Sequence, residues 1–449
     1  MIARGASSEY NSEMQNLPDF SAHRASVLER LGDDEAILLF GAPTHLRNGD
    51  SDYRYRPESD VYWLTGWEDP QVAVFLRNGD EPLTMFVQPK DPTREVWDGF
   101  RPGPDGAKKD FGADAAFEVA QIEKELPRLL QGVSKLHYGF ARDTDNDALL
   151  MSSIRTAARA ARRNGLSSPE TFYSPSLVLH EVRLLKTDTE VALMREAARV
   201  SGEAHKAAMR AAIPGMHEYQ IEALIEGCFK QNGSTGPGYT CIVAAGANAT
   251  VLHYVRNRDP LRDGDLLLVD AGCEISYYTA DITRTWPVNG KFSDPQRRFY
   301  EGVLRAQEAA IAAVKPGNTL NDVHDAAVRG LTEAMVSLRL LEGEVDALIS
   351  DESYKKYYMH GTSHWLGLDV HDVGVYGRDG ETRPLEPGMV LTVEPGLYVA
   401  ADDTDAPEEL RGLGVRIEDD VLVTVDGFDI LTAAVPKTVA DLERICAGH

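Results

Sequence analysis

The feature that most constrains the fold is a nine-residue stretch that occurs twice in the second half of the chain. Gly-Asp-Leu-Leu-Leu-Val-Asp-Ala-Gly at 264–272 matches Gly-Met-Val-Leu-Thr-Val-Glu-Pro-Gly at 388–396, at a constant offset of 124 residues (394 − 270). Each copy is an apolar run, typical of a buried strand, that ends on a carboxylate, Asp270 or Glu394. Because a match this short can arise by chance between two buried strands, agreement between the flanking segments has to support it.

The helical patterns that precede the two copies supply this agreement. An amphipathic pattern over 187–229 is interrupted at Pro214-Gly215, and an Ala-rich pattern over 297–335 is interrupted at Pro316-Gly317. Each unit therefore consists of a helix, a Pro-Gly break and a second helix, in the same order relative to its strand. Repetition at this scale predicts an α/β domain with an internal pseudo-twofold duplication.

The first part of the chain predicts a separate α/β domain. A length of 449 residues exceeds the size at which one hydrophobic core usually stops growing. Residues 122–130 and 144–161 favour helix, and the Gly- and Pro-containing loop 164–176 indicates a boundary. We therefore predict two domains, 1–178 and 179–449. Short apolar segments alternate with turn-rich pieces before the boundary, at 36–40, 61–65, 72–76 and 83–87.

Composition indicates a globular protein of a reducing compartment. Hydrophobic residues make up 43% and charged residues 26% of the chain, and no apolar run approaches the roughly 20 residues that span a bilayer. The N-terminal segment contains no apolar stretch typical of a secretory signal, so a cytoplasmic location is expected. Four cysteines without CxxC spacing predict reduced thiols, namely Cys228, Cys241, Cys273 and Cys446.

The chain is strongly acidic, with 46 Lys and Arg against 71 Asp and Glu, a formal net charge of −25. Such a field repels phosphate backbones and anionic membrane surfaces, so neither nucleic acid nor membrane is an expected partner. Most of these carboxylates are expected to belong to a solvated surface, and only a few to a functional site.

Four carboxylates stand at equivalent places in the two halves. Asp281 follows Asp270 in a β-rich segment that can pair back as a hairpin after the turn near 272, and Glu418 follows Glu394 in the same way. Four converging carboxylates repel one another, and two divalent cations would balance their charge. The alternative is a set of unrelated acids, each in its own salt bridge.

Histidines are concentrated in the segment 359–372, which contains three of the chain's 12: His360, His364 and His371. Glycines within the segment and the absence of an HExxH arrangement argue against a helical single-zinc site and favour a loop or strand. Carboxylates with one imidazole suit Mn²⁺ first, with Co²⁺, Fe²⁺ or Zn²⁺ as alternatives. Two metals about 3.5–4 Å apart can activate a shared water, so the pattern predicts hydrolysis.

In these motifs the chain resembles the Xaa-Pro aminopeptidases, members of the creatinase or "pita-bread" metallopeptidase superfamily. The resemblance covers nearly the whole length and implies a creatinase-like N-terminal α/β domain followed by a pita-bread domain. Residues 53–66 resemble the aminopeptidase P N-terminal domain. The matching stretches of the second domain are 263–272, 281–287, 360–374, 386–398 and 414–420.

The resemblance assigns a role to each of the five candidate metal ligands. It implies that Asp270 binds one metal, that His364 and Glu394 bind the other, and that Asp281 and Glu418 bridge both. Glu394 would also carry the proton from the attacking water to the leaving nitrogen.

Five further residues match positions around the substrate in the family. His253 and His371 would hydrogen-bond the scissile region, while His360 and Arg416 would line the pocket for proline and the peptide beyond it, which Tyr239 would join. Three simpler interpretations stay open: a buried structural histidine at 253, neutralisation of Glu418 by the arginine, and plain packing by the tyrosine.

Two positions in other parts of the chain bear on assembly and reactivity. Trp97 lies in a segment, 95–99, that in tetrameric relatives approaches a neighbouring subunit's site, although it could equally belong to a local core. The resemblance thus implies a homo-oligomer, a dimer or a tetramer. Cys241 stands where relatives commonly have Pro, Thr or Ser, and near a metal pocket it would confer sensitivity to thiol reagents.

The expected activity is hydrolysis of the N-terminal Xaa-Pro bond, with peptides that carry proline at the second position as partners. A prolidase, which cleaves only Xaa-Pro dipeptides, uses the same ligands and is the nearest alternative. A non-catalytic pita-bread module that binds peptides or proteins is a second, and creatinase-like amidinohydrolysis a third.

Overall fold

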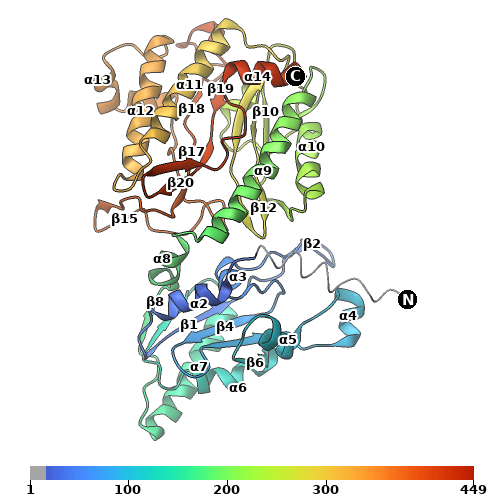
Figure 1. The fold of residues 1–449 in the computed structure, drawn as a ribbon, viewed down its shortest axis with the longest axis vertical. Helices are drawn as coiled ribbons and strands as arrows, with labels where there is room; N and C mark the ends of the chain where they lie inside the picture. The colour runs from blue at the N-terminus through green and yellow to red at the C-terminus, as the bar shows by residue number, and fades with distance from the viewer. Residues whose placement is uncertain (1–16, 449) are drawn as a thin grey trace. The chain divides into compact units, whose positions relative to one another are not determined.

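The computed structural model describes residues 17–448. These residues form two compact units, one of residues 18–183 and one of residues 184–448 together with residue 17 (Figure 1). The boundary that the sequence predicts between 178 and 179 stays a prediction.

A mixed six-stranded sheet forms the centre of the first unit, in the order β6-β5-β4-β1-β7-β8. The apolar segments at 36–40, 72–76 and 83–87 supply its central strands, whose side chains are almost all buried. The fourth apolar segment, 61–65, is helical, because the side chain of Glu58 accepts the N–H of Val61 and so caps the start of a helix whose residues are all buried. The strands are β1 (Glu35–Phe40), β4 (Ala73–Arg77), β5 (Leu83–Val87), β6 (Ala115–Glu118), β7 (Lys135–His137) and β8 (Thr171–Tyr173).

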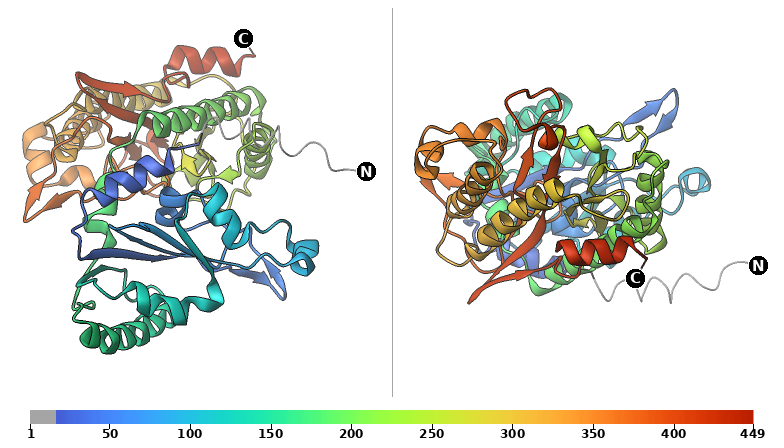
Figure 2. Two further views of the ribbon diagram at one scale, coloured as in Figure 1. Left: turned by 60° about the horizontal axis from the view of Figure 1, so that its bottom comes forward. Right: turned by 90° about the horizontal axis from the view of Figure 1, so that it is seen from above.

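Helices cover both faces of this sheet, as the left view of Figure 2 shows for α2 and α7. The predicted helices at 122–130 and 144–161 are α6 and α7, whose apolar sides pack on the sheet. Strand β8 lies inside the predicted loop 164–176, because it pairs with β7, a partner distant in sequence. The helices are α2 (Phe20–Leu28), α3 (Ser59–Thr65), α4 (Pro92–Asp98), α5 (Gly103–Asp110), α6 (Ile122–Leu129), α7 (Thr144–Asn164) and α8 (Leu179–Arg183), with a small hairpin of β2 (Leu46–Asn48) and β3 (Ser51–Asp52).

The second unit contains the two predicted helix pairs, each interrupted where Pro-Gly stands. Thr187 and Ser293 cap the first helix of each pair with a side chain that accepts a backbone N–H, as part of a capping box. In Figure 1 the pairs α9–α10 and α11–α12 flank the strands of the unit. The helices are α9 (Asp188–Ala211), α10 (Glu218–Gln231), α11 (Asp294–Ala312), α12 (Leu320–Ser337), α13 (Val345–Ser350) and α14 (Val439–Cys446).

Two three-stranded sheets lie between the helix pairs, β10-β11-β14 and β17-β20-β21. In each sheet the strand that leads to a candidate carboxylate, β11 or β17, pairs antiparallel with the strand that follows the second carboxylate. The sheets comprise β10 (Ile242–Ala245), β11 (Leu266–Asp270), β14 (Thr283–Pro287), β17 (Val390–Val393), β20 (Asp419–Thr424) and β21 (Gly427–Ile430). The short strands are β9 (Gly236–Pro237), β12 (Cys273–Ile275), β13 (Tyr278–Thr279), β15 (Gly377–Arg378), β16 (Glu381–Thr382), β18 (Gly396–Tyr398) and β19 (Gly414–Arg416).

The connection between β11 and β14 is more elaborate than the simple hairpin that the sequence suggests. A second hairpin, β12–β13, is inserted after Gly272 and forms its own small sheet with β9. A Cβ at Gly272 would lie 1.7 Å from the carbonyl oxygen of Ala280, so only glycine allows the two segments to approach this closely. This approach brings the end of β11 next to the start of β14.

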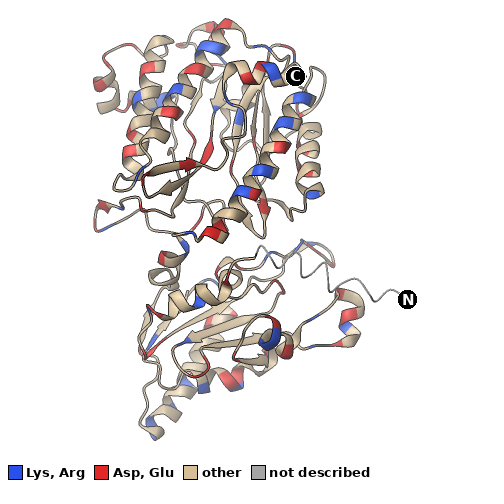
Figure 3. Ribbon diagram, viewed as in Figure 1, with Lys and Arg blue, Asp and Glu red and all other residues tan. Residues whose placement is uncertain are grey.

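Charged residues are distributed over the helices of both units rather than gathered in one region of the sequence (Figure 3). On α9, acidic and basic residues pair at a spacing of three, as in Arg199–Glu196 and Lys206–Glu203, both at 2.6 Å. This distribution agrees with an acidic, solvated surface. Among residues 17–448, no helix combines the length and the hydropathy that crossing a membrane requires.

The buried His205 provides a test of how α9 packs against the residue that follows β11. Its Nε2 lies 2.9 Å from the backbone oxygen of Ala271, and burial lowers the pKa of His205 from 6.5 to about 4. Between those pH values the folded protein binds fewer protons than the unfolded chain, so the free energy of unfolding should fall by up to about 3 kcal/mol as the pH drops from 6.5 to 4. Denaturant unfolding of His205→Gln should show a smaller fall, and equal falls in both proteins would contradict the assignment.

Candidate metal centre

The two sheets bring four carboxylates together at equivalent strand ends. Asp270 ends β11 and Glu394 follows β17, while Asp281 and Glu418 stand just before β14 and β20. Because β11 pairs antiparallel with β14, and β17 with β20, the end of one strand meets the start of its partner. The predicted arrangement of two hairpin-like pairs of acids is therefore present.

Residues 362–366 of the histidine segment run alongside β17 in an extended conformation. The N–H of Thr392 donates to the carbonyl of His364 at 3.0 Å, and that of Leu366 donates to Val390 at 3.0 Å. An isolated bridge joins Trp365 to Leu391. As the glycine-containing sequence suggests, none of the three histidines lies on a helix: His364 belongs to the strand-like stretch, and His360 and His371 lie in bends.

His364 points its Nε2 atom at the acids. This nitrogen lies 3.4 Å from Oδ2 of Asp281 and 3.6 Å from Oε1 of Glu394. The other ring nitrogen, Nδ1, lies 3.0 Å from the carbonyl oxygen of Trp365, to which it can donate. Such a bond to the backbone orients a metal-binding imidazole and leaves Nε2 available for a cation.

Three of the predicted ligands have the spacing of a metal site. Ligand atoms of Asp281, His364 and Glu418 all lie within 4.8 Å of one another. Glu394 adjoins this group through His364, and Asp270 interacts electrostatically with Asp281. A donor set rich in carboxylate oxygen, with one imidazole, fits hard or borderline divalent cations.

The electrostatics of these acids also fit a cation site. Burial raises the pKa of Glu394 to about 8 and that of Glu418 well above its usual range, and neighbouring carboxylates add to both effects. Burial likewise raises the pKa of Asp270. Burial opposes ionisation of Asp281 and His364 as well, but their hydrogen bond lowers the pKa of Asp281 and helps raise that of His364 to about 9. To keep all four acids ionised at neutral pH, the group needs positive charge beyond its protein neighbours.

Arg416 and Tyr239 hold Asp270 from two sides. Arg416 Nη2 donates to Asp270 Oδ2 at 2.6 Å, and the Tyr239 hydroxyl donates to Oδ1 at 2.7 Å. Arg416 Nη1 also donates to the hydroxyl of Tyr398 at 3.2 Å. The guanidinium thus pairs directly with Asp270 rather than serving only to neutralise Glu418, and the tyrosine does more than pack.

The other predicted site histidines contact His364, Tyr398 or one another's electrostatic field. The ring of His371 lies edge-on to it, with centroids 4.5 Å apart, and His360 Nε2 lies 2.9 Å from the Tyr398 hydroxyl. Burial lowers the pKa of His360 to about 4 and also lowers that of His371, and the charge of His253 acts in the same direction on both. His253 is itself exposed, which excludes the alternative of a buried structural histidine.

The environments of Trp97 and Cys241 bear on the two interpretations made from the sequence, a local core around Trp97 and a reactive thiol at Cys241. Trp97 lies on α4 of the first unit with 82% of its surface exposed, so it is not part of a local core. Cys241 is 1% exposed, and burial raises the pKa of its thiol, so it should react poorly with thiol reagents. The sensitivity inferred from sequence alone is therefore not supported.

Other polar residues contact the site without having been singled out in the sequence. Thr283 donates from Oγ1 to Glu418 Oε2 at 2.7 Å, and the carboxylate of Asp420 accepts from the N–H of Asp281 at 3.1 Å. Thr283 follows Asp281 by two positions, and Asp420 follows Glu418 by two. Alternate residues of an extended chain share a face, so this period of two is the signal that would have found them.

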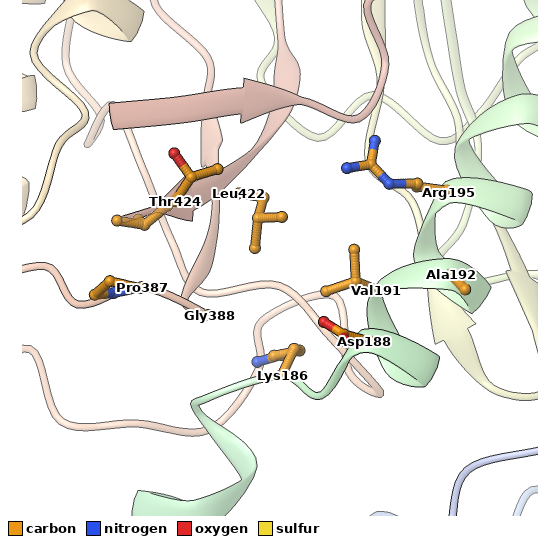
Figure 4. Close-up of a pocket in the computed structure, with 10 residues that line it drawn as sticks. Lys186, Asp188, Val191, Ala192, Arg195, Pro387, Gly388, Leu422 and Thr424 are labelled. Carbon is orange, nitrogen blue, oxygen red and sulfur yellow. The ribbon is translucent and has the colours of Figure 1, made fainter. Parts of the chain in front are cut away.

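A separate hollow of about 410 Å³ lies between the start of α9 and β20 (Figure 4). No predicted site residue lines it. Its two cationic side chains have acidic partners, since Lys186 pairs with Asp372 at 2.8 Å and Arg195 with Asp429. The lining residues are Lys186, Asp188, Val191, Ala192, Arg195, Pro387, Gly388, Leu422, Val423 and Thr424.

Comparison with known proteins agrees with this architecture. Residues 192–425 match the model of Metallopeptidase family M24, and residues 20–138 match the model of the aminopeptidase P N-terminal domain. The Xaa-Pro aminopeptidase of Escherichia coli is 41% identical over 430 residues, which cover 95% of this chain and 97% of that relative.

Solved structures extend the agreement to three dimensions. Aminopeptidase PepP of Pseudomonas aeruginosa superimposes with a TM-score of 0.94 at 45% identity, covering 96% of this chain and 99% of that one. Zinc-substituted E. coli aminopeptidase P in complex with product gives a TM-score of 0.92 at 40% identity, covering 96% and 98%. The predicted fold class is confirmed. The chain therefore belongs to Metallopeptidase family M24 and is a hydrolase with the two-domain fold of aminopeptidase P.

Proposed function

We propose that the protein hydrolyses the bond between the first residue of a peptide and a proline at the second position. The observation that carries this proposal is full-length similarity to an Xaa-Pro aminopeptidase, combined with a cluster of acids and histidine at equivalent strand ends. Proline-containing peptides are then the substrates. A non-catalytic module would have no need for so costly a group of buried acids.

Two divalent ions, Mn²⁺ by preference, complete the proposed site. Asp270 would hold one ion, His364 and Glu394 would hold the other, and Asp281 and Glu418 would contact both. The spacing within 4.8 Å of ligand atoms of Asp281, His364 and Glu418 supports this assignment, as does the approach of His364 Nε2 to Asp281 and Glu394. When bound, two such ions lower the pKa of a shared water and stabilise the oxyanion that forms in hydrolysis.

Glu394 is the proposed proton carrier. It accepts a proton from the attacking water and delivers it to the nitrogen of the leaving proline. Its side chain is 19% exposed, compared with 12% for Asp270 and 7% for Asp281, so among these acids it is the most accessible to a substrate.

The histidines and Arg416 bind the substrate around this centre. His253 and His371 hydrogen-bond the scissile region, and their proximity to His364 and His360 supports that role. His360 and Arg416 line the pocket for proline, linked by their shared contact with the Tyr398 hydroxyl. Tyr239, whose hydroxyl donates to Asp270, joins this pocket.

A homo-oligomer is the proposed assembly. Helix α4 and the residue after the next glycine expose three large apolar side chains, Val96, Trp97 and Phe100, each by more than 70%. A second copy of the chain would cover such a surface, which supports a role for Trp97 at a neighbouring subunit's site. A cytoplasmic location stays a prediction of the sequence.

A comparison of two substrates tests the function. The Mn²⁺-loaded protein should cleave an Xaa-Pro-Xaa tripeptide with a kcat/KM at least about tenfold above that for the matching Xaa-Pro dipeptide, since only the tripeptide reaches the pocket beyond proline. Kinetics of free amino acid release would measure both. A preference for the dipeptide would identify a prolidase instead, and a protein that cleaves neither peptide would revive the non-catalytic module.

A further inference from the structure

Glu218, the first residue of α10, is a fully buried carboxylate outside the proposed metal centre. Its two oxygens accept four hydrogen bonds. Oε1 accepts from the N–H of Ala245 at 2.8 Å and from Asn248 Nδ2 at 2.9 Å. Oε2 accepts from the Tyr254 hydroxyl at 2.8 Å and from the N–H of Asp259 at 2.9 Å. Three of the four donors lie in the connection between β10 and β11, and the fourth, Ala245, is the last residue of β10.

These bonds do not cap the helix that Glu218 begins. The capping box of α10 is made by His217 and Gln220, with the Gln220 side chain accepting from the His217 N–H at 2.9 Å. The N–H of Glu218 itself donates to the carbonyl of Asp259 at 3.0 Å, so the residue binds the loop through both backbone and side chain. Its contacts are therefore those of an anchor for the loop.

The loop that Glu218 anchors, residues 245–259, carries His253. Beyond a short helical turn, Gly246–Thr250, it contains no regular element. His253 is exposed, whereas the next residue, Tyr254, is 9% exposed and held by its hydroxyl. The buried tyrosine thus determines where the chain turns outward and where the neighbouring imidazole emerges.

We infer that Glu218 is a positioning residue, which places His253 among the site histidines by holding Tyr254 and both ends of the loop. This inference rests on the proposed function, in which His253 hydrogen-bonds the substrate. A carboxylate suits the place because it presents only acceptors, whereas a glutamine would aim its NH₂ group at donors. The loop would then relax, and a catalytic geometry tolerates little displacement.

A double-mutant cycle tests the inference. Glu218→Gln should lower kcat/KM for an Xaa-Pro-Xaa tripeptide roughly 10- to 100-fold, in line with the cost of a displacement of about 1 Å. In a His253→Ala background the same substitution should change kcat/KM by less than about twofold, because the group through which it acts is gone. Tyr254→Phe, which removes only a hydroxyl, should show a smaller loss of kcat/KM with the same dependence on His253. It replaces Glu218→Gln in the cycle if that variant fails to fold.

Glu190→Gln is the matched control. Glu190 is also a buried glutamate in the first turn of a helix, and it also accepts a tyrosine hydroxyl, that of Tyr278 at 2.7 Å. Its other carboxylate oxygen accepts from Thr187, so these bonds hold the start of α9 and not the loop. Any loss of kcat/KM that Glu190→Gln causes should be the same in the wild-type and in the His253→Ala background. Calorimetry should find equal Mn²⁺ affinity in wild type and Glu218→Gln, because Glu218 contacts none of the proposed ligands.

The outcomes separate the inference from the function on which it rests. Losses from Glu218→Gln that persist undiminished in His253→Ala overturn the positioning role while leaving the peptidase assignment intact. Full activity of His253→Ala would instead remove the proposed role of that histidine, and the inference with it. The NMR resonance of the His253 ring, assigned by its loss in His253→Ala, should shift in Glu218→Gln even if no peptide is cleaved, and an unshifted resonance would refute the inference.

Discussion

Glu394→Gln should lower kcat for an Xaa-Pro-Xaa peptide by about 10³-fold or more, since general acid–base groups alone commonly contribute 10²–10⁴. The substitution removes the proposed proton carrier and one ligand charge while preserving the shape of the side chain. Folding should survive, because burial raises the pKa of Glu394 to about 8 and the amide removes one charge from a group of like charges. Steady-state kinetics at saturating metal and thermal unfolding measure the two effects.

Glu386→Gln is the corresponding control, since Glu386 precedes the same strand and its side chain is half exposed. It should retain wild-type kcat and Tm. Glu394→Gln with kcat within a few-fold of wild type would remove the glutamate from the mechanism. A loss of folding in Glu394→Gln alone would show that this acid stabilises the sheet end instead.

Removal of divalent ions should abolish peptide hydrolysis and lower the Tm. Four carboxylates converge at the proposed metal centre, and without cations they must either bind protons or repel one another. Because a ligand that binds only the folded state stabilises it by mass action, Mn²⁺ at 100 times its Kd should add about 2.7 kcal/mol, or roughly 5–10 °C in Tm. Differential scanning calorimetry of chelator-treated protein titrated with Mn²⁺, Co²⁺ and Zn²⁺ would measure the rise and rank the metals.

Asp281→Asn and Asp263→Asn form a matched pair for this experiment. Asp281 is one of the three clustered ligands, whereas Asp263 is exposed and bonds Asn289. The first variant should lose most of the metal-dependent rise in Tm and the second should keep it. An equal rise in both would show that the cations bind elsewhere.

Metal affinity should also increase with pH. Asp281 and Glu394 help raise the pKa of His364 to about 9, and a cation binds only the deprotonated imidazole. The metal-free protein therefore holds more protons than the loaded protein near pH 7, and each step toward pH 9 should lower the apparent Kd. Calorimetric titrations in buffers of different ionisation enthalpy would detect the released proton, and a pH-independent Kd would contradict this assignment.

Much of the site could be predicted because its acids stand in repeated apolar contexts. Asp270 and Glu394 end matching strands, and Asp281 and Glu418 precede the strands that pair with them. The histidine-rich segment was recognisable from its density alone. Roles within the set came from family resemblance, because spacing does not tell which acid bridges two cations.

Other features depended on neighbours that are remote in sequence. The hairpin β12–β13 interrupts the expected turn after Gly272, and its pairing with β9 follows no local pattern. Segment 61–65 is apolar enough for a strand, but a cap at Glu58 makes it a helix. Local propensity is a weak guide where caps and distant partners determine conformation.

The amino-acid sequence alone determined the duplicated strand ends, the helix pairs and the identity of the acids, because these depend on periodicity and on residue type at fixed spacing. Tertiary structure decided which groups meet: Arg416 with Asp270, His364 with Asp281, and Glu218 with the loop of His253. In each of these pairs the two groups are separated by at least 27 residues of chain. Only packing of the sheets and helices brings such groups within hydrogen-bond reach, where burial then changes their charge and their chemistry.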